Sequence, residues 1–249
     1  MVLNFAIIDI IKETKNTTSL ILKEITNQIN NFYAGQYLTF LINEENSIVK
    51  RSYSISSSPL VLPLIRITIK KNQNFPSYTN FVDYLKIGDI LVSEPVNGNF
   101  YVDPFITNNN NYLFISGGSG ITPPFSMIST ILETEINSQV ILLNQNRNEN
   151  SIIFYNELKK LSIKFIDNFK LINILSKPIE KWDGLAGRIT FELLEKFYLE
   201  NRQFINNCDI YVCGPGGLID TVYNVFNYYE VDNYRIHKEV YNLKKTTVI

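Results

Sequence analysis

The residue pattern changes near Pro104, and this change constrains the fold more than any other feature. Before Pro104, short segments rich in β-branched and aromatic residues are separated by Gly, Asn or Pro clusters, a pattern typical of an antiparallel β-barrel. A short helical stretch is expected at residues 81–85. The six predicted strands are residues 5–11, 19–24, 36–42, 48–56, 64–70 and 90–94.

After Pro104, apolar strands alternate with amphipathic helices, which predicts βαβ units on a parallel sheet. The expected strands are residues 112–116, 140–144, 169–175, 209–213 and 234–241, and the expected helices are residues 123–133, 152–161, 190–199 and 218–228. We therefore predict two domains, a six-stranded antiparallel β-barrel at residues 1–105 and an α/β parallel-sheet nucleotide-binding domain at residues 106–249. The polar run at residues 108–111 is interpreted as a linker.

Composition excludes several classes of function. A net charge of −1 without clustered basic residues argues against a nucleic-acid partner. Cys208 and Cys213 are the only cysteines, and on one strand they would lie about 16 Å apart, too far for a disulfide. With a single His they cannot form a closed zinc site or an iron–sulfur cluster, so no metal site is predicted. Neither a signal peptide nor a membrane span is apparent, and a cytoplasmic location is expected.

A glycine-rich turn at residues 116–124 follows an apolar strand and opens a predicted helix. Glycines let the backbone approach a ligand, and the helix N-terminal amides can bind a phosphate. Thr122 is the predicted N-cap, and Pro123 replaces the last glycine of the usual dinucleotide fingerprint. Arg147 follows the next strand where a ribose-binding carboxylate would be usual, which favours NADP(H). The alternative is a tight turn without a ligand.

A second glycine turn, at residues 213–217, ends a later strand at the same edge of the predicted sheet. Ligands bind at this carboxyl edge in such folds. Cys213 could contact a planar ring there, or it could be a buried thiol, which is the commoner environment of cysteine.

The segment Arg51-Ser52-Tyr53-Ser54 alternates along a predicted strand, so that Arg51 and Tyr53 share one face. An arginine can neutralise a pyrophosphate, a tyrosine ring can pack on an isoalloxazine, and the Ser54 hydroxyl could reach a ring nitrogen. The alternative is an ordinary exposed strand.

Four blocks in order resemble the ferredoxin–NADP reductase superfamily, in particular its bacterial oxidoreductase branch. They are residues 51–54, residues 88–89 with 95–100, residues 117–123, and residues 213–215. The resemblance covers nearly the whole chain and implies a flavoenzyme that binds FAD on the barrel and NAD(P)H on the α/β domain.

The resemblance also implies roles for individual residues on the barrel. Arg51 would pair with the FAD pyrophosphate, Tyr53 would pack on the flavin, and Ser54 would contact flavin N5. Further cofactor contacts are expected from the turn of Thr79, Asn80 and Phe81 and from the backbone of Ile67, Ile69 and Lys70. Residues 75–77 replace the glycine that usually precedes this turn.

On the second domain the resemblance assigns the dinucleotide to both glycine turns. Gly118 and Gly120 would bind pyrophosphate, and Thr122 would approach the nicotinamide. Cys213 and Glu239 would flank hydride transfer, and with Ser54 they are the candidate catalytic residues. The remaining candidate cofactor contacts are Gly214, Pro215, Tyr241, Arg147 and Arg188, the two arginines as partners of a 2′-phosphate. For His237 a structural or surface role is favoured over a catalytic base.

The implied function is FAD-dependent electron transfer between NAD(P)H and a one-electron protein carrier, ferredoxin or flavodoxin. Relatives with a fused ferredoxin domain have four further cysteines, so any iron–sulfur centre is expected on another protein. Two alternatives stay open. One is an NAD(P)H:flavin reductase that uses free flavin, and the other is an electron-relay subunit of an oxygenase or other multicomponent complex.

Overall fold

The computed structural model describes residues 2–26, 28–29, 31–44, 47–71, 79–179, 181–241 and 247–248. The replaced glycine position at residues 75–77 lies outside them. The chain divides into two compact units. The first contains residues 1–103, Phe125–Thr130 and 242–249, and the second contains Pro104–Pro124 and Ile131–Tyr241.

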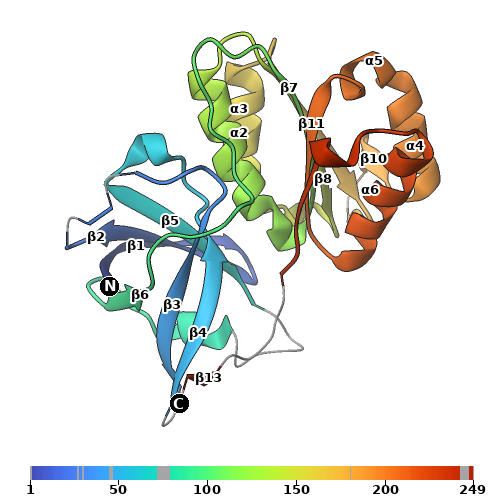
Figure 1. Cartoon of the computed structure of the whole chain (residues 1–249). Helices are drawn as coiled ribbons and strands as arrows, with labels where there is room; N and C mark the ends of the chain where they lie inside the picture. Colours follow the sequence, from blue (N-terminus) through green and yellow to red (C-terminus); the bar gives the residue numbers. More distant parts are fainter. Residues whose placement is uncertain are drawn as a thin grey trace. The chain divides into compact units, whose positions relative to one another are not determined.

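The first unit is an antiparallel β-barrel (Figure 1). Its strands are β1 (Leu3–Thr14), β2 (Thr17–Glu24), β3 (Tyr37–Glu44), β4 (Ser47–Ser54), β5 (Leu64–Lys70), β6 (Ile90–Ser93) and the short β13 (Thr247–Val248), in the order β13-β4-β3-β6-β1-β2-β5. The sheet closes where Ile55, just after β4, bridges Ile67 in β5. The Ser56 N–H donates to the Arg66 carbonyl at 2.7 Å beside this bridge. The predicted six-stranded barrel is thus confirmed, with β13 added along β4.

Alternating residues of these strands fill the barrel, as the period-2 pattern requires. Fully buried Phe5 and Phe40 meet edge to face, with ring centroids 6.1 Å apart. Two glycines allow the chain to turn at the ends of β6, Gly88 with φ 93° and Gly98 with φ 123°. A Cβ on Gly98 would lie 3.1 Å from the Tyr37 ring, so the second turn also needs glycine for close packing.

The second unit contains a six-stranded parallel sheet in the order β10-β9-β8-β7-β11-β12. The strands are β7 (Asn111–Gly117), β8 (Gln139–Asn146), β9 (Phe169–Leu175), β10 (Leu185–Ala186), β11 (Cys208–Cys213) and β12 (Ile236–Glu239). Helices α2 (Thr122–Thr134) and α3 (Tyr155–Lys164) lie on one side of the sheet, and α4 (Phe191–Glu200) and α6 (Gly216–Tyr228) lie on the other (Figure 1). The short α5 (Arg202–Ile205) precedes β11. The predicted α/β fold is confirmed.

The strand order reverses between β7 and β11, because the chain first adds β8, β9 and β10 on one side and then β11 and β12 on the other. Ligands of open α/β sheets bind at the carboxyl ends of the strands beside such a reversal. Ser116 and Cys213 are paired at the carboxyl ends of β7 and β11. Both glycine turns therefore leave the sheet side by side.

Several predicted element boundaries are wrong. Thr122 is the first residue of α2 rather than its N-cap, because a 3-10 turn at Gly118–Ile121 precedes the helix. Helix α3 begins at Tyr155, since the apolar residues before it are buried in a loop and Phe154 has φ 59°. The last strand, β12, is shorter than predicted and follows a 3-10 turn at Asn233–Arg235.

Other short turns are Pro59–Val61, Asn80–Asp83 and Glu149–Ser151, all 3-10 helices. The second replaces the helical stretch expected at residues 81–85. Among the described residues, the longest helices have 13 residues, and none is long and apolar enough to cross a membrane.

Candidate cofactor-binding sites

Arg51 lies on the interior face of β4 and is fully buried. It pairs with Phe40 of β3, and its Nη1 donates to the Lys50 carbonyl at 3.1 Å. A buried guanidinium is stable only where hydrogen-bond acceptors or anions surround it. The location suits a residue that holds a pyrophosphate.

Tyr53 shares this face and is half-buried. Its ring lies 6.1 Å from Phe81 and 6.4 Å from Phe40, measured between centroids. The Phe81 contact brings the predicted Thr79–Phe81 turn to the Arg51 strand. Thr79 is buried and directly precedes the 3-10 turn Asn80–Asp83.

Ser54 is buried at the end of β4, whereas Ser52, on the same predicted face, is exposed and bonds Thr39 Oγ1 at 2.8 Å. The side chains of Ile67 and Ile69 are packed in the barrel core, so only their backbone groups could contact a ligand. Lys70 follows them, and burial lowers the pKa of its ammonium group.

The sequence interpretation missed Arg66, a second buried arginine of the first unit. Its Nη2 donates to the Ser56 carbonyl at 3.2 Å, and its guanidinium lies 5.0 Å from the centroid of Phe125. The sequence signal was a cation, Arg66, that interrupts the apolar residues of β5 (Leu64–Lys70).

In the second unit the two glycine turns touch. A Cβ on Gly120 would lie 2.2 Å from the Cys213 carbonyl oxygen and 2.8 Å from Gly214 Cα. A Cβ on Gly117 would likewise lie 3.0 Å from the Pro215 ring and 3.9 Å from Gly214 Cα. Gly118 has φ 59°, a conformation that favours glycine. These glycines are thus required by close packing of two backbone turns.

The end of β12 and the residues after it lie beside the two glycine turns. Thr122 Oγ1 donates to the Ser119 carbonyl at 3.0 Å and bonds the Tyr241 hydroxyl at 2.9 Å. Glu239 is paired with Cys213 across β11 and β12. Burial, together with the Glu239 charge, raises the pKa of the Cys213 thiol despite a hydrogen bond with Tyr241, so the thiol is uncharged near neutral pH. The structure therefore brings Thr122, Cys213, Glu239 and Tyr241 together.

Arg147 and Arg188 are exposed. Arg147 follows β8 at the carboxyl edge, and Arg188 follows β10 at the same edge. His237 lies further from this edge, stacked on Tyr211 at 4.5 Å and 3.6 Å from an Asp209 oxygen.

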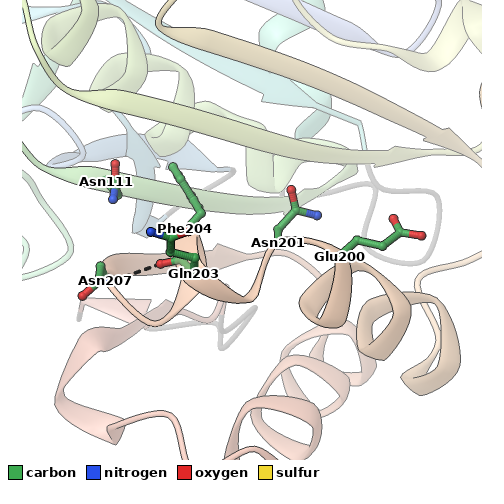
Figure 2. Close-up of a pocket in the computed structure, with 6 residues that line it drawn as sticks. All are labelled: Asn111, Glu200, Asn201, Gln203, Phe204 and Asn207. Atoms are coloured by element: carbon green, nitrogen blue, oxygen red, sulfur yellow. Dashed lines mark hydrogen bonds between the residues drawn. The ribbon is translucent and has the colours of Figure 1, made fainter.

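A polar hollow of about 450 Å³ lies elsewhere, where α4, α5 and the start of β7 meet (Figure 2). Its lining residues are Asn111, Glu200, Asn201, Gln203, Phe204 and Asn207. Two of these side-chain amides donate hydrogen bonds to helix carbonyls. Asn201 donates to the Phe197 carbonyl at 2.8 Å, and Asn207 donates to the Gln203 carbonyl at 2.9 Å. The hollow is at the amino edge of the sheet, opposite the glycine turns.

Comparison of the sequence with known proteins finds a matching family and several relatives. Residues 114–224 match the oxidoreductase NAD-binding domain family. The glycine betaine monooxygenase reductase subunit of Pseudomonas aeruginosa is 33% identical over 84% of this chain and 56% of its own length. One component of the 1,2-phenylacetyl-CoA epoxidase of Escherichia coli is 29% identical over 87% of this chain and 61% of its own length. The chain thus spans only part of these curated relatives.

Solved structures show the same fold. The FAD/NAD-binding domain of nitric oxide dioxygenase from Vibrio cholerae superposes with a TM-score of 0.82 at 22% identity, covering 96% of this chain and 98% of that one. Ferredoxin–NADP⁺ reductase from Plasmodium falciparum, solved with 2′P-AMP, gives 0.79 at 23% identity and covers 96% of both chains. Residues 114–224 therefore belong to the oxidoreductase NAD-binding domain family, and the chain shares the two-domain fold of ferredoxin–NADP⁺ reductase that its motifs predicted.

Proposed function

We propose that the chain is an FAD-dependent oxidoreductase that transfers electrons between NAD(P)H and a one-electron protein carrier. The contact between the two glycine turns carries this proposal, because it places Thr122, Cys213 and Glu239 at the sheet reversal where dinucleotides bind. The family fold supports FAD and NAD(P)H as its cofactors.

The residues of the barrel fit a flavin dinucleotide. Buried Arg51 offers a positive charge for the pyrophosphate, and the family resemblance assigns further contacts to the turn of Thr79, Asn80 and Phe81. Tyr53 and Phe81 offer aromatic surface. Bound FAD would supply the redox chemistry by accepting two electrons as hydride and releasing them singly.

On the second unit the proposed roles are binding and orientation. Amides of the Gly118–Ile121 turn would hold the dinucleotide pyrophosphate. Thr122 and the uncharged Cys213 would border the nicotinamide, with Glu239 beside them. Hydride transfer needs no proton from these groups, so their task is to position the ring.

Ser54 gives the sharpest test of the catalytic assignment. Ser54→Ala should leave FAD bound but slow hydride transfer at least about tenfold, the size of one lost hydrogen bond to a reacting group. Stopped-flow flavin reduction measures the rate, and flavin absorbance after gel filtration measures retention. Ser52→Ala, on an exposed neighbour in the same strand, should keep the wild-type rate. Equal rates for both variants would remove Ser54 from the site.

The absorbance measurement also separates the rival enzyme class. A purified protein that carries FAD agrees with a resident cofactor. A colourless protein that reduces added flavin would instead be an NAD(P)H:flavin reductase.

We further infer that NADPH is preferred over NADH. Arg147 and Arg188 supply exposed positive charge at the carboxyl edge, and the structurally similar Plasmodium reductase was solved with 2′P-AMP. Stopped-flow reduction with each nucleotide tests this preference. A difference below about fivefold, roughly 1 kcal/mol, would overturn it.

For the electron acceptor we propose ferredoxin or flavodoxin. The named relatives are components of a monooxygenase and an epoxidase, which supports the alternative of an electron-relay subunit in an oxygenase complex. Reduction of a soluble ferredoxin or flavodoxin by the purified protein agrees with the first function. Activity that appears only after an oxygenase component is added would favour the second.

A further inference from the structure

We propose that Gln145 is a specificity-determining positioning residue, which holds the turn bearing Arg188 beside the strand end bearing Arg147 and so forms one 2′-phosphate subsite. The inference rests on the proposed use of NADP(H). Gln145 lies at the end of β8, paired with Gly117 of the glycine turn on one side and with Ile174 of β9 on the other.

The two arginines belong to strands that are not neighbours. Leu185 of β10, Ile174 of β9 and Gln145 of β8 form one row across the sheet. Neighbouring strands are about 4.8 Å apart, so β10 and β8 are separated by about 10 Å. Strand pairing alone therefore leaves Arg188 two strands away from Arg147.

A side-chain bond crosses this gap. The Gln145 Oε1 accepts a hydrogen bond from the backbone N–H of Ile189, the residue after Arg188. The chain after β10 must therefore pass over the end of β9 toward β8. Gly187, with φ 112°, begins this turn and donates to the Leu175 carbonyl at 2.9 Å, and Ile189 ends it with its side chain buried in the core. Arg188 is thus held between two anchored residues.

The subsite contains a third cation, Lys177, and one acidic residue, Glu149, follows Arg147 by two positions. Lys177 is exposed, and its backbone N–H donates a hydrogen bond to the Arg147 carbonyl at 2.7 Å. Within the described ranges, none of Arg147, Lys177 and Arg188 forms an ion pair. Glu149, the acidic residue of the same loop, accepts from the Ile179 N–H at 3.0 Å. Three cations at one edge match the charge of a phosphate monoester.

The test compares two ligands that differ only in the 2′-phosphate, adenosine 2′,5′-bisphosphate and adenosine 5′-monophosphate, by calorimetric titration of the purified full chain. Wild type should bind the bisphosphate at least about tenfold more tightly, the size of one charge-assisted hydrogen bond. Gln145→Met removes the acceptor at similar volume and should reduce this ratio to about threefold or less. Its affinity for the monophosphate should not change, which also shows that the variant is folded.

Two further variants make the test specific. Gln139→Met places the same substitution at the exposed start of β8 and should keep the wild-type ratio. Arg188→Ala should lower the ratio, and Gln145→Met combined with Arg188→Ala should lower it no further, because Gln145 acts through Arg188. An unchanged ratio in Gln145→Met, or losses that add in the double variant, would overturn the inference.

The outcomes also separate this inference from the proposed function. If wild type binds both ligands equally, no 2′-phosphate subsite exists and the inference fails, while electron transfer from NADH would still stand. If neither ligand binds, the dinucleotide site itself is wrong. If inorganic phosphate competes as strongly as the bisphosphate, the edge binds free anions and does not select NADP(H).

Discussion

Gly120 illustrates at the residue scale how the second unit depends on two turns in contact. Its missing side chain lets the first glycine turn lie on the Cys213 carbonyl, only 2.2 Å from where a Cβ would be. The Cys213 carbonyl oxygen and Gly214 Cα are both backbone atoms, so neither can move away without displacing the backbone of the second glycine turn. Such forced displacement costs about 1–3 kcal/mol in packed interiors.

Gly120→Ala should therefore destabilise the protein by about 2 kcal/mol and weaken dinucleotide binding. Chemical unfolding and a titration with NADP⁺ measure the two effects. Gly216→Ala is the matched control for the unfolding measurement alone, because nothing lies within 4 Å of its added Cβ and its backbone is helical. Wild-type behaviour of Gly120→Ala would mean that the turns separate at little cost.

Glu24 should make the stability of the fold depend on pH. Burial alone would raise the pKa of its carboxyl, but hydrogen bonds from Thr26 and from the backbone N–H groups of Thr26, Gln28 and Ile29 lower it below the ordinary 4.5. A lowered folded-state pKa means that Glu24 stabilises the fold above pH 4.5, and that this contribution is lost as pH falls toward the folded-state value.

Replacing Glu24 by Gln should lower stability at neutral pH and flatten the acid side of the profile. Urea unfolding of wild type and variant between about pH 7 and pH 3 measures both effects. Parallel profiles would show that Glu24 does not stabilise through its charge.

At the scale of elements, the strands and long helices could be predicted because each carries its own periodicity. The two glycine turns could also be found, since their residues are consecutive. The start of α3 could not, because the apolar residues Ile152, Ile153 and Phe154 fit a helix face as well as a buried loop. The hydrogen bond between Gln145 and Ile189 joins residues 44 positions apart, and no local pattern encodes it.

The segment before β7 shows the same limit. Its asparagines are typical of a flexible linker, but Asn108 donates to the buried Glu135 carboxylate at 2.7 Å. Tyr112 donates to the same oxygen at 3.2 Å, and Ser138 donates to the other at 2.6 Å. Glu135, at the end of α2, thereby anchors this segment to the second unit.

Glu135→Ala should destabilise the protein by about 3 kcal/mol, because several buried donors lose their acceptor. Glu133→Ala is the control two residues away, whose bond to Lys164 at 2.5 Å joins side chains 44% and 58% exposed. Its cost should stay below about 1 kcal/mol. Similar unfolding midpoints for the two variants would show that the anchor contributes little.

At the scale of the whole molecule, the chain has two compact units. One hydrophobic cluster consists of barrel residues, and another lies between the parallel sheet and helices α4 and α6. The change in pattern near Pro104 could predict two fold types, because barrel strands and βαβ units differ in period and spacing. It could not predict that Phe125–Thr130, in the middle of α2, packs with the first unit. Ser126 Oγ makes this contact by donating to the Ser57 carbonyl at 2.6 Å.

Separate proposed sites for FAD and NADP(H) predict separate responses to the two nucleotides. In hydrogen exchange measured by mass spectrometry, NADP⁺ added to the purified protein should protect residues 116–122, 145–148, 186–189 and 213–217, because ligand binding suppresses local opening where it makes contacts. Residues 3–24, the hairpin of β1 and β2, serve as the internal control and should not change. Removal of bound flavin should instead increase exchange at residues 47–54 and 79–83. Protection of the barrel segments by NADP⁺, with none at the glycine turns, would contradict the assignment of the dinucleotide to the second unit.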